Sequence, residues 1–426
     1  MIYEIGTNLY FLFVLITSMV GSMYYRSQAM LIARAIISLL IIFVSGIGIN
    51  KKLRSVLIIW ILFVLICSII SNHFAAGPLI RFISMFLESY ILLRLFKQKF
   101  TEIYVKWILV FSMISLIGWC LSVINIEWLI SFLSPINISG GYEADSPIGL
   151  YIHTGFYTIN WIPNDIWGLS LPRNAGFCWE PGGFSLLVVL AIYINFILKK
   201  ENILSWKNIL LFVTLLTTFS TTGYLALLGL LIYEYSAKRK SLFSIISLVV
   251  IIILSYHIFF RYQFLSGKVS AYSEMRPYVT STPTGDVLAG SRIAGYSLVL
   301  QDLKKNPLFG KALISTGNYG EYGEIITWHL NSIYTITSTM GLVGLLLWLW
   351  FVVNSSKSLS KIYNHYSKYG FLIFIILSSF GFNVHSLSII FTFATYGYFI
   401  PTTYKITQKA SGRKSTISQE YNKNIL

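Results

Sequence analysis

Apolar residues in this chain gather in long runs separated by short polar stretches. Runs of ~18 residues or more are typical of helices that span a bilayer, and they recur along the whole sequence. Alternating segments of ~10 residues, which would indicate a membrane β-barrel, are not found in the sequence. We therefore predict an all-α polytopic membrane protein with about twelve transmembrane helices. The predicted spans are centred on residues 8–25, 30–49, 55–74, 79–96, 105–125, 182–198, 205–220, 223–236, 241–260, 329–353, 369–384 and 386–402.

Two long segments between these spans define the organisation of the chain. Their Gly, Pro and Ser residues argue against further spans, and loops of this length are usually functional. A short polar break at Ser220-Thr-Thr-Gly223 predicts that residues 205–236 form two helices rather than one. The predicted regions are an N-terminal bundle of about five helices (1–125), a first large loop (126–181), central helices (182–261), a second large loop (262–328), C-terminal helices (329–402) and a basic tail (403–426).

Composition and charge support this class and orient the helices. Only 11% of the residues are charged and 55% are hydrophobic, which excludes a soluble enzyme and a disordered chain. The net charge of +16 is carried mostly by short patches between apolar runs, so we interpret it as positive-inside anchoring rather than nucleic-acid binding. With alternating spans all patches fall on one side, which predicts cytoplasmic termini and two periplasmic loops. The scattered Cys67, Cys120 and Cys178 form neither a disulfide framework nor a zinc motif.

The first large loop offers two candidate site residues near its end. Arg173 is the only basic residue in an otherwise acidic loop, so it cannot be a retention signal, and its guanidinium suits phosphate oxygens. Glu180 precedes Pro181, where a carboxylate is either a helix-cap charge or a general base. The loop is also rich in aromatic residues, which form either an interfacial belt or platforms for sugar rings: Tyr142, Tyr151, Tyr157, Trp161, Trp167 and Trp179.

The second large loop and the start of the span that follows it contain four more candidate site residues. An amphipathic pattern from Ser291 to Lys305 predicts a helix whose first turn would carry Arg292, either as an anion ligand or as a solvated cation. Arg276 is a weaker candidate of the same kind. His329 can exchange protons near neutral pH or simply be hydrogen-bonded at the membrane interface, and Asn331 lies beside it.

Among the ionisable residues inside predicted spans, three are candidates for a function, because charges at membrane depth are functional candidates by default. They are Arg34, Arg81 and Glu88. Arg81 and Glu88 are seven positions apart and so share one helix face, from which both could pair with groups in the bundle. Arg81 lies near the outer end of its span, where snorkelling to the surface is an alternative explanation.

These residues carry a family resemblance. The string Arg173-x-x-Gly176-x-x-x-Glu180-Pro-Gly resembles a signature of the O-antigen polymerase and ligase family. So do Ser291-Arg292, followed by Asn306-Pro-Leu-Phe-Gly310, and His329-x-Asn331 before a Gly-Leu-x-Gly span. The resemblance covers roughly residues 170–350, and the earlier spans match only in hydropathy. The Glu-Pro-Gly form and the residue between His329 and Asn331 favour the polymerase over the ligase.

The resemblance implies a C-type glycosyltransferase fold in the bacterial cytoplasmic membrane. It implies an oligosaccharide on undecaprenyl pyrophosphate as substrate, transferred with inversion to a new repeat unit. Arg173 and Arg292, with Arg276, would hold the departing pyrophosphate, and Glu180 or His329 would accept the proton of the attacking hydroxyl, supported by Asn331 and Arg81. Because the leaving group is already activated, we expect no cofactor and no metal. A chain-length regulator in the membrane would be a partner.

Other functions remain open at this point. A ligase would transfer the finished chain to lipid A core. A flippase or other transporter would share the span count, but it would place its binding charges near the midplane and have short outer loops. A non-catalytic assembly protein would tolerate loss of Arg173. A channel is least supported, because no filter-like element is visible in the sequence.

Overall fold

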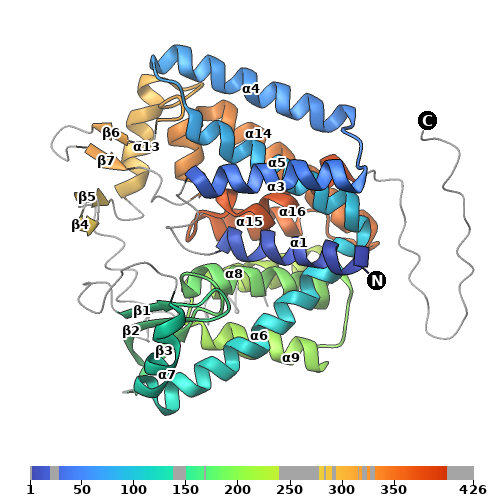
Figure 1. Cartoon of the computed structure of the whole chain (residues 1–426), viewed down its shortest axis with the longest axis vertical. Coiled ribbons are helices and arrows are strands. Elements are labelled where there is room, and N and C mark those ends of the chain that lie inside the picture. The colour runs from blue at the N-terminus through green and yellow to red at the C-terminus, as the bar shows by residue number, and fades with distance from the viewer. Residues whose placement is uncertain are drawn as a thin grey trace, which may run out of the picture.

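The computed structural model describes residues 2–19, 28–137, 150–166, 169–238, 278–282, 285–289, 294–314, 316–318, 324–326 and 332–400. Over these residues the chain is a bundle of helices with small β-sheets gathered at one end (Figure 1). The mostly helical fold expected from the sequence is thus confirmed. The bundle helices are α1 (Ile2–Met19), α3 (Gln28–Ser45), α4 (Lys51–Ser71), α5 (Ala76–Phe96), α6 (Phe100–Ile124), α8 (Pro181–Ile192), α9 (Trp206–Thr217), α10 (Thr221–Lys238), α14 (Ser332–Ile362), α15 (Gly370–Ser379) and α16 (Ser388–Phe399).

Membrane-spanning character is clear for part of this bundle. Among the described residues, four stretches are long and apolar enough to cross a bilayer, and five shorter apolar helices accompany them. The four are Lys51–Ser71, Ala76–Ile124, Pro181–Leu198 and Ser332–Ile362. The second contains α5 and α6, joined through the short helix η1 (Lys97–Lys99). The predicted total of about twelve spans is not confirmed, and the span expected at 241–260 lies outside the described residues.

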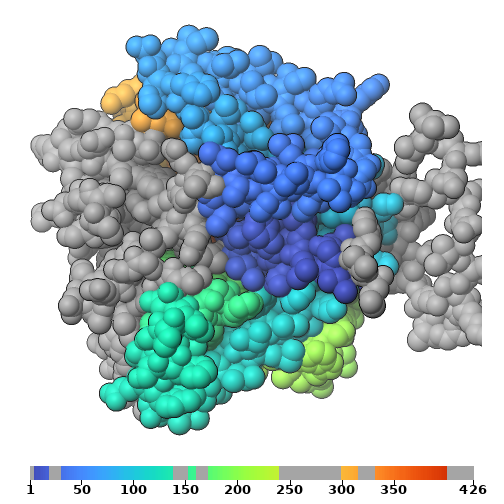
Figure 2. Space-filling model, in the orientation of Figure 1, coloured from blue at the N-terminus to red at the C-terminus, as the bar shows by residue number. Residues whose placement is uncertain are grey.

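The centre of the bundle is formed by α8 and α16. Nearly every residue of both helices is buried, and a helix that is apolar all round is expected to be enclosed by others. A π-helical turn, η3 (Tyr193–Leu198), continues α8. The N-terminal helices α1, α3, α4 and α5 form the face shown in blue in Figure 2, with α6 below them.

The connections give the bundle two chemically different ends. A short turn joins α4 to α5, so the lysines that begin α4 and those of η1 lie at one end, and the α4–α5 turn lies at the other. The same alternation places Lys199 and Lys200, after η3, and Lys361, near the end of α14, with the basic residues. The β-sheets lie at the opposite end (Figure 1).

Both long loops contain strands that the sequence analysis did not predict. The first sheet is antiparallel and has the order β1 (Leu150–His153), β2 (Thr158–Ile166), β3 (Leu169–Asn174), with a register shift between β2 and β3. The second has the order β4 (Tyr278–Thr282), β5 (Gly285–Ala289), β7 (Glu324–Ile326), β6 (Thr316–Asn318), and β5 pairs with β7 in parallel.

Helices in these two loops are short. α7 (Ile126–Leu133) and the turn η2 (Ser134–Ile136) precede the first sheet. Outside the two loops, the short turn η6 (Val384–Ser386) joins α15 to α16. Helix α13 (Ala294–Lys305) confirms the helical spacing predicted for the second loop.

The predicted break between residues 205 and 236 is also confirmed. α9 ends at Thr217 and α10 begins at Thr221. Phe219 between them has a φ of 46°, and the side-chain oxygen of Ser220 accepts a hydrogen bond from the amide of Gly223 at 3.3 Å. A serine in this position satisfies an amide that the start of a helix leaves without an intrahelical partner.

Candidate functional site

The most unusual element of the bundle is a break inside α14. Gly341 has φ 62° and ψ −162°, so the helix changes direction there. A break frees amides that the helix would otherwise pair, and such groups are tolerated at membrane depth only where protein or a cavity receives them. The segment that follows α13 accepts hydrogen bonds from these freed amides. The amides of Leu342 and Val343 donate to the carbonyls of Pro307 and Leu308 at 3.0 and 3.1 Å.

The carbonyls on the other side of the break are paired in the same way. Ser338 and Thr339 accept from the amides of Lys311 and Leu313, both at 2.7 Å. This exchange requires close backbone approach, because a Cβ atom on Gly310 would collide with the carbonyl of Ser338. The segment 306–314 and the break in α14 therefore form one spliced unit.

This unit joins two sequence motifs that lie far apart in the chain. Asn306-Pro-Leu-Phe-Gly310 supplies the carbonyls, and Gly341 of the Gly-Leu-x-Gly pattern supplies the break. Asn306 also shapes its own turn, since its side-chain oxygen accepts from the amide of Phe309 at 3.2 Å. Part of the family-like pattern is thus explained by backbone packing.

A polar cavity of about 730 Å³ opens beside this unit, and we call it the kink cavity. It lies at the same end of the bundle as the β-sheets, because its residues come from the α4–α5 turn, the start of α5, the spliced unit and η6. Its lining comprises His73, Phe74, Ala75, Ala76, Gly77, Pro78, Arg81, Phe82, Leu313, Ile314, Thr335, Thr339, Met340 and His385. Arg81, which the sequence analysis assigned a supporting role, is therefore a cavity residue.

His385 is a cavity residue that the sequence analysis missed. It lies in η6 and is 94% buried, with its backbone amide donating to the hydroxyl of Ser332 at 3.1 Å and its Nδ1 lying 3.2 Å from the same oxygen. Burial and the positive charge of Arg81 lower the pKa of His385 to about 3. The imidazole is therefore neutral at physiological pH and can donate or accept a hydrogen bond inside the cavity.

The other predicted charges in the spans form a buried ion pair. Arg34 Nε and Nη2 contact the Glu88 carboxylate at 2.7 and 2.6 Å, and Arg34 also donates to the hydroxyl of Ser388. Both charged side chains are almost completely buried, at 1% and 0% exposure. The expectation that Glu88 pairs within the bundle is confirmed. Through Arg34, Glu88 and Ser388 the hydrogen bonds connect α3, α5 and α16.

Arg173 lies on β3, opposite Asn160 on β2, and its side chain is half-buried. Its Nε donates to the carbonyl of Thr218 at 3.3 Å. Thr218 is the C-cap residue of α9, where carbonyls lack helical partners and a cation is favoured by the helix dipole. Arg173 is at the predicted end of the bundle, and it has this structural interaction in addition to any role in binding.

Neighbouring hydrogen bonds fix the strand that carries Arg173. Trp119 of α6 donates its indole N–H to the carbonyl of Pro172 at 2.8 Å. The buried amide of Asn174 donates to the hydroxyls of Thr217 and Ser115 at 2.9 and 3.2 Å. We call β3 with these contacts and the start of α8 the first-loop site.

Glu180 occupies the N-cap position of α8, directly before Pro181, as the sequence predicted. Its side chain is exposed and makes no capping hydrogen bond to the helix amides. The carboxylate nevertheless lies close to the first turn, where a negative charge is stabilised by the helix dipole. Burial and the charge of Glu180 raise the pKa of Cys178 well above its usual value, so this thiol stays protonated. Both the cap-charge and the general-base hypotheses for Glu180 stay open.

The remaining predicted site residues, Arg276, Arg292, His329 and Asn331, lie outside the described residues. The structure thus brings Arg81 and His385 together, and it places Arg173 and Glu180 in the neighbouring first-loop site. Within the described part of the chain, no three His, Cys, Asp or Glu side chains are grouped as metal ligands.

Chemically, the kink cavity suits an anionic polar group. It combines a guanidinium and a neutral imidazole, whose N–H groups can donate hydrogen bonds to phosphate or sugar oxygens. Comparison with models of known protein families, with curated proteins and with solved structures finds no match for this chain. The function is therefore argued from the residues themselves.

Proposed function

We propose that this protein is a membrane glycosyltransferase that polymerises oligosaccharide repeat units carried on undecaprenyl pyrophosphate. The growing glycan moves to a new repeat unit and undecaprenyl pyrophosphate leaves. The observation that carries the proposal is the kink cavity, which holds Arg81 at the loop end of an apolar helix bundle. A substrate with a charged head and a membrane-bound tail needs a site of this kind.

The proposed chemistry assigns roles to cations and to a base. Cleavage of the anomeric carbon–oxygen bond places negative charge on the pyrophosphate, which cations at a partly desolvated site stabilise. Arg81 in the cavity, Arg173 on β3 and Arg292 are the proposed cations. Glu180 or His329 accepts the proton from the attacking hydroxyl.

The two ends of the bundle suggest the orientation. Basic patches at one end match the positive-inside rule, so we propose that this end faces the cytoplasm, with both termini. The loop end with the kink cavity then faces the periplasmic side of a bacterial cytoplasmic membrane, where the lipid-linked repeat units would be exposed.

Replacing the cavity cation tests the function. We expect Arg81→Ala to abolish polymerised surface glycan in cells that lack the wild-type gene, because the pyrophosphate loses its cation. Arg173→Ala should have the same result, and Arg173→Lys should also fail if the site uses both arms of the guanidinium. The readout is the glycan ladder on a gel, normalised to the amount of protein in the membrane.

The control is Arg54→Ala, which changes a cation in the basic patch at the other end of the bundle. It should leave the ladder unchanged. Deleting the whole chain separates the alternatives: single repeat units on the lipid anchor indicate a polymerase, glycan that is not attached to the surface indicates a ligase, and loss of precursor from the outer leaflet indicates a flippase. Wild-type ladders in both Arg81→Ala and Arg173→Ala would contradict the proposal.

A further inference from the structure

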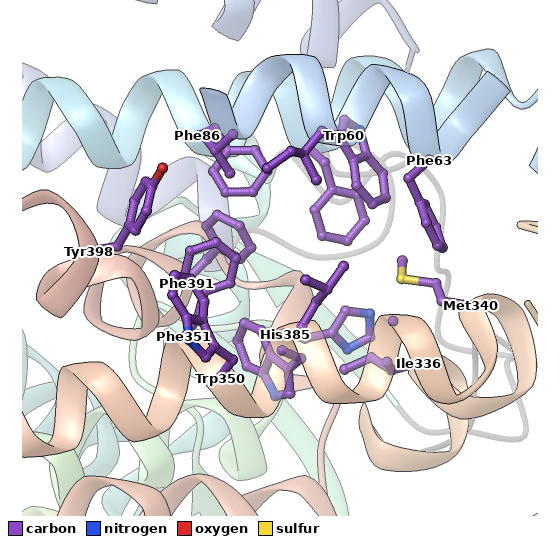
Figure 3. Close-up of a pocket in the computed structure, with 16 residues that line it drawn as sticks. Trp60, Phe63, Phe86, Ile336, Met340, Trp350, Phe351, His385, Phe391 and Tyr398 are labelled. Carbon is purple, nitrogen blue, oxygen red and sulfur yellow. The ribbon is translucent and has the colours of Figure 1, made fainter. Parts of the chain in front are cut away.

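A second, almost entirely apolar hollow adjoins the kink cavity. It has a volume of about 120 Å³ and lies between α4, α5, α14 and α16 (Figure 3). Phe82, Met340 and His385 line both hollows, so the two lie side by side and share these side chains. We call the apolar hollow the aromatic groove. Its lining comprises Val56, Ile59, Trp60, Phe63, Phe82, Phe86, Ile336, Met340, Gly344, Leu347, Trp348, Trp350, Phe351, His385, Phe391 and Tyr398.

The groove has a buried aromatic floor and an exposed apolar rim. Trp348 and Phe391 on the floor are 6% and 1% exposed, and their rings stack with centroids 6.0 Å apart. Ile59, Leu347 and Trp350 at the rim are 52%, 37% and 49% exposed. In a bilayer these rim residues would face lipid, so the groove can be entered from the side.

The groove also has a direction and a length. On the part of α14 that follows the break at Gly341, its lining runs from Gly344 to Phe351, which at the rise of an α-helix corresponds to about 10 Å. Its far end is closed near Tyr398, whose hydroxyl donates to the carbonyl of Lys52 at 3.0 Å. The groove thus runs from the cavity that holds Arg81 toward the basic end of the bundle.

We propose that the aromatic groove binds the polyprenyl chain of a lipid diphosphate whose diphosphate lies in the kink cavity beside Arg81. This inference rests on the proposed function and adds where the lipid carrier binds. Its basis is that the two hollows adjoin each other: an amphiphile with an anionic head and an apolar tail matches a cavity that holds Arg81 and lies beside an apolar groove.

The shape favours one polyprenyl chain over a phospholipid. The aromatic groove is one narrow hollow of about 120 Å³, whereas a phospholipid carries two acyl chains. A methyl-branched, unsaturated chain also presents flat segments that pack against the aromatic floor, where burial of apolar surface stabilises binding. The competing occupant, a phospholipid, is therefore an outcome that the experiment must distinguish.

Two adjacent leucines on α14 provide a matched test. Leu347 lines the groove, whereas Leu346 is 64% exposed and does not. Undecaprenyl pyrophosphate and dioleoyl phosphatidic acid would be titrated separately into the purified protein, with bound lipid measured by native mass spectrometry. We expect Leu347→Trp to weaken undecaprenyl pyrophosphate binding at least about tenfold by filling the groove, and Leu346→Trp to change it by less than about twofold.

Equal binding by both variants, or phosphatidic acid binding as tightly as undecaprenyl pyrophosphate, would overturn the proposal. A measurement on the unmodified protein guards against misfolded variants: farnesyl diphosphate should bind at least about tenfold more tightly than inorganic pyrophosphate. Equal affinities would refute a tail-binding groove. Lipid binding is measured without glycan synthesis. A protein that binds the lipid but makes no polymer would therefore contradict only the proposed enzyme function and not the lipid-binding groove.

Discussion

The first-loop site and the kink cavity place a cation at the same end of the bundle in two different ways. Arg173 donates to the carbonyl that ends α9, so its position is explained by the helix it contacts. Arg81 lines an open cavity of about 730 Å³. A sequence pattern can therefore locate a cation at a loop end, but only the structure shows whether its side chain contacts a helix terminus or lines a cavity.

The two regions also differ in how they are held together. Side-chain hydrogen bonds from Trp119 and Asn174 fix the first-loop site. The kink cavity instead depends on backbone groups exchanged between the segment 306–314 and α14. Losing one side-chain hydrogen bond costs about 1 kcal/mol, whereas forcing two backbones apart affects several bonds at once. The kink cavity should therefore be the region that is more sensitive to small substitutions.

The largest effect is expected for Gly341→Ala. The added Cβ would collide with the carbonyl of Leu308, and alanine is strained at a φ of 62°. Strain and overpacking together should cost about 4 kcal/mol of folding free energy. We expect a strongly reduced thermal unfolding temperature in detergent and little recovered protein.

The control is Gly48→Ala, because a Cβ at Gly48 meets nothing within 4 Å. It should behave like the unmodified protein. If Gly341→Ala is as stable as Gly48→Ala, then the spliced unit does not determine the stability of the cavity, and the contrast with the first-loop site is lost.

A smaller effect should appear as a pH dependence of the kink cavity. The pKa of His385 is about 3 in the folded protein and near 6.5 when unfolded. Because the unfolded chain binds the proton more readily, stability is highest above the unfolded pKa and falls on acidification. The loss from this residue should reach about 2 kcal/mol between about pH 7 and about pH 5.

His385→Gln should remove that part of the pH dependence, as judged from unfolding curves at each pH. Arg81→Gln should keep most of it, because burial, the larger cause of the lowered pKa of His385, persists in that variant. His73→Gln is the control, because its substitution leaves His385 and Arg81 in place. An unchanged acid dependence in His385→Gln would show that other groups cause it.

Much of the architecture follows from the sequence, because apolar runs and polar breaks are local signals. The break before α10 and the helix α13 were predicted from such signals, and the pairing of Glu88 from its depth in a span. The strands of both loops were not predicted, because they are short and lack a regular alternation. The strands pair with partners that are separated from them along the chain, and no pattern in the sequence indicates which strands pair.

The kink cavity was predicted only through Arg81. His385 was not among the predicted site residues, although it lies in a short polar break between two apolar runs at the loop end. That placement is a usable signal. The exchange between the segment 306–314 and α14 could not be derived, since a glycine motif does not reveal which distant backbone approaches it.

The smallest predicted effect tests the first-loop site and uses two tryptophans on α6. Trp119 donates its indole N–H to the carbonyl of Pro172 at 2.8 Å, next to Arg173. The buried indole N–H of Trp107 has no hydrogen-bond partner among the described residues. Trp119→Phe should therefore lower the free energy of unfolding by about 1 kcal/mol, whereas Trp107→Phe should leave it unchanged or raise it. Equal losses in both variants would mean that ring size, rather than the hydrogen bond, anchors the strand that carries Arg173.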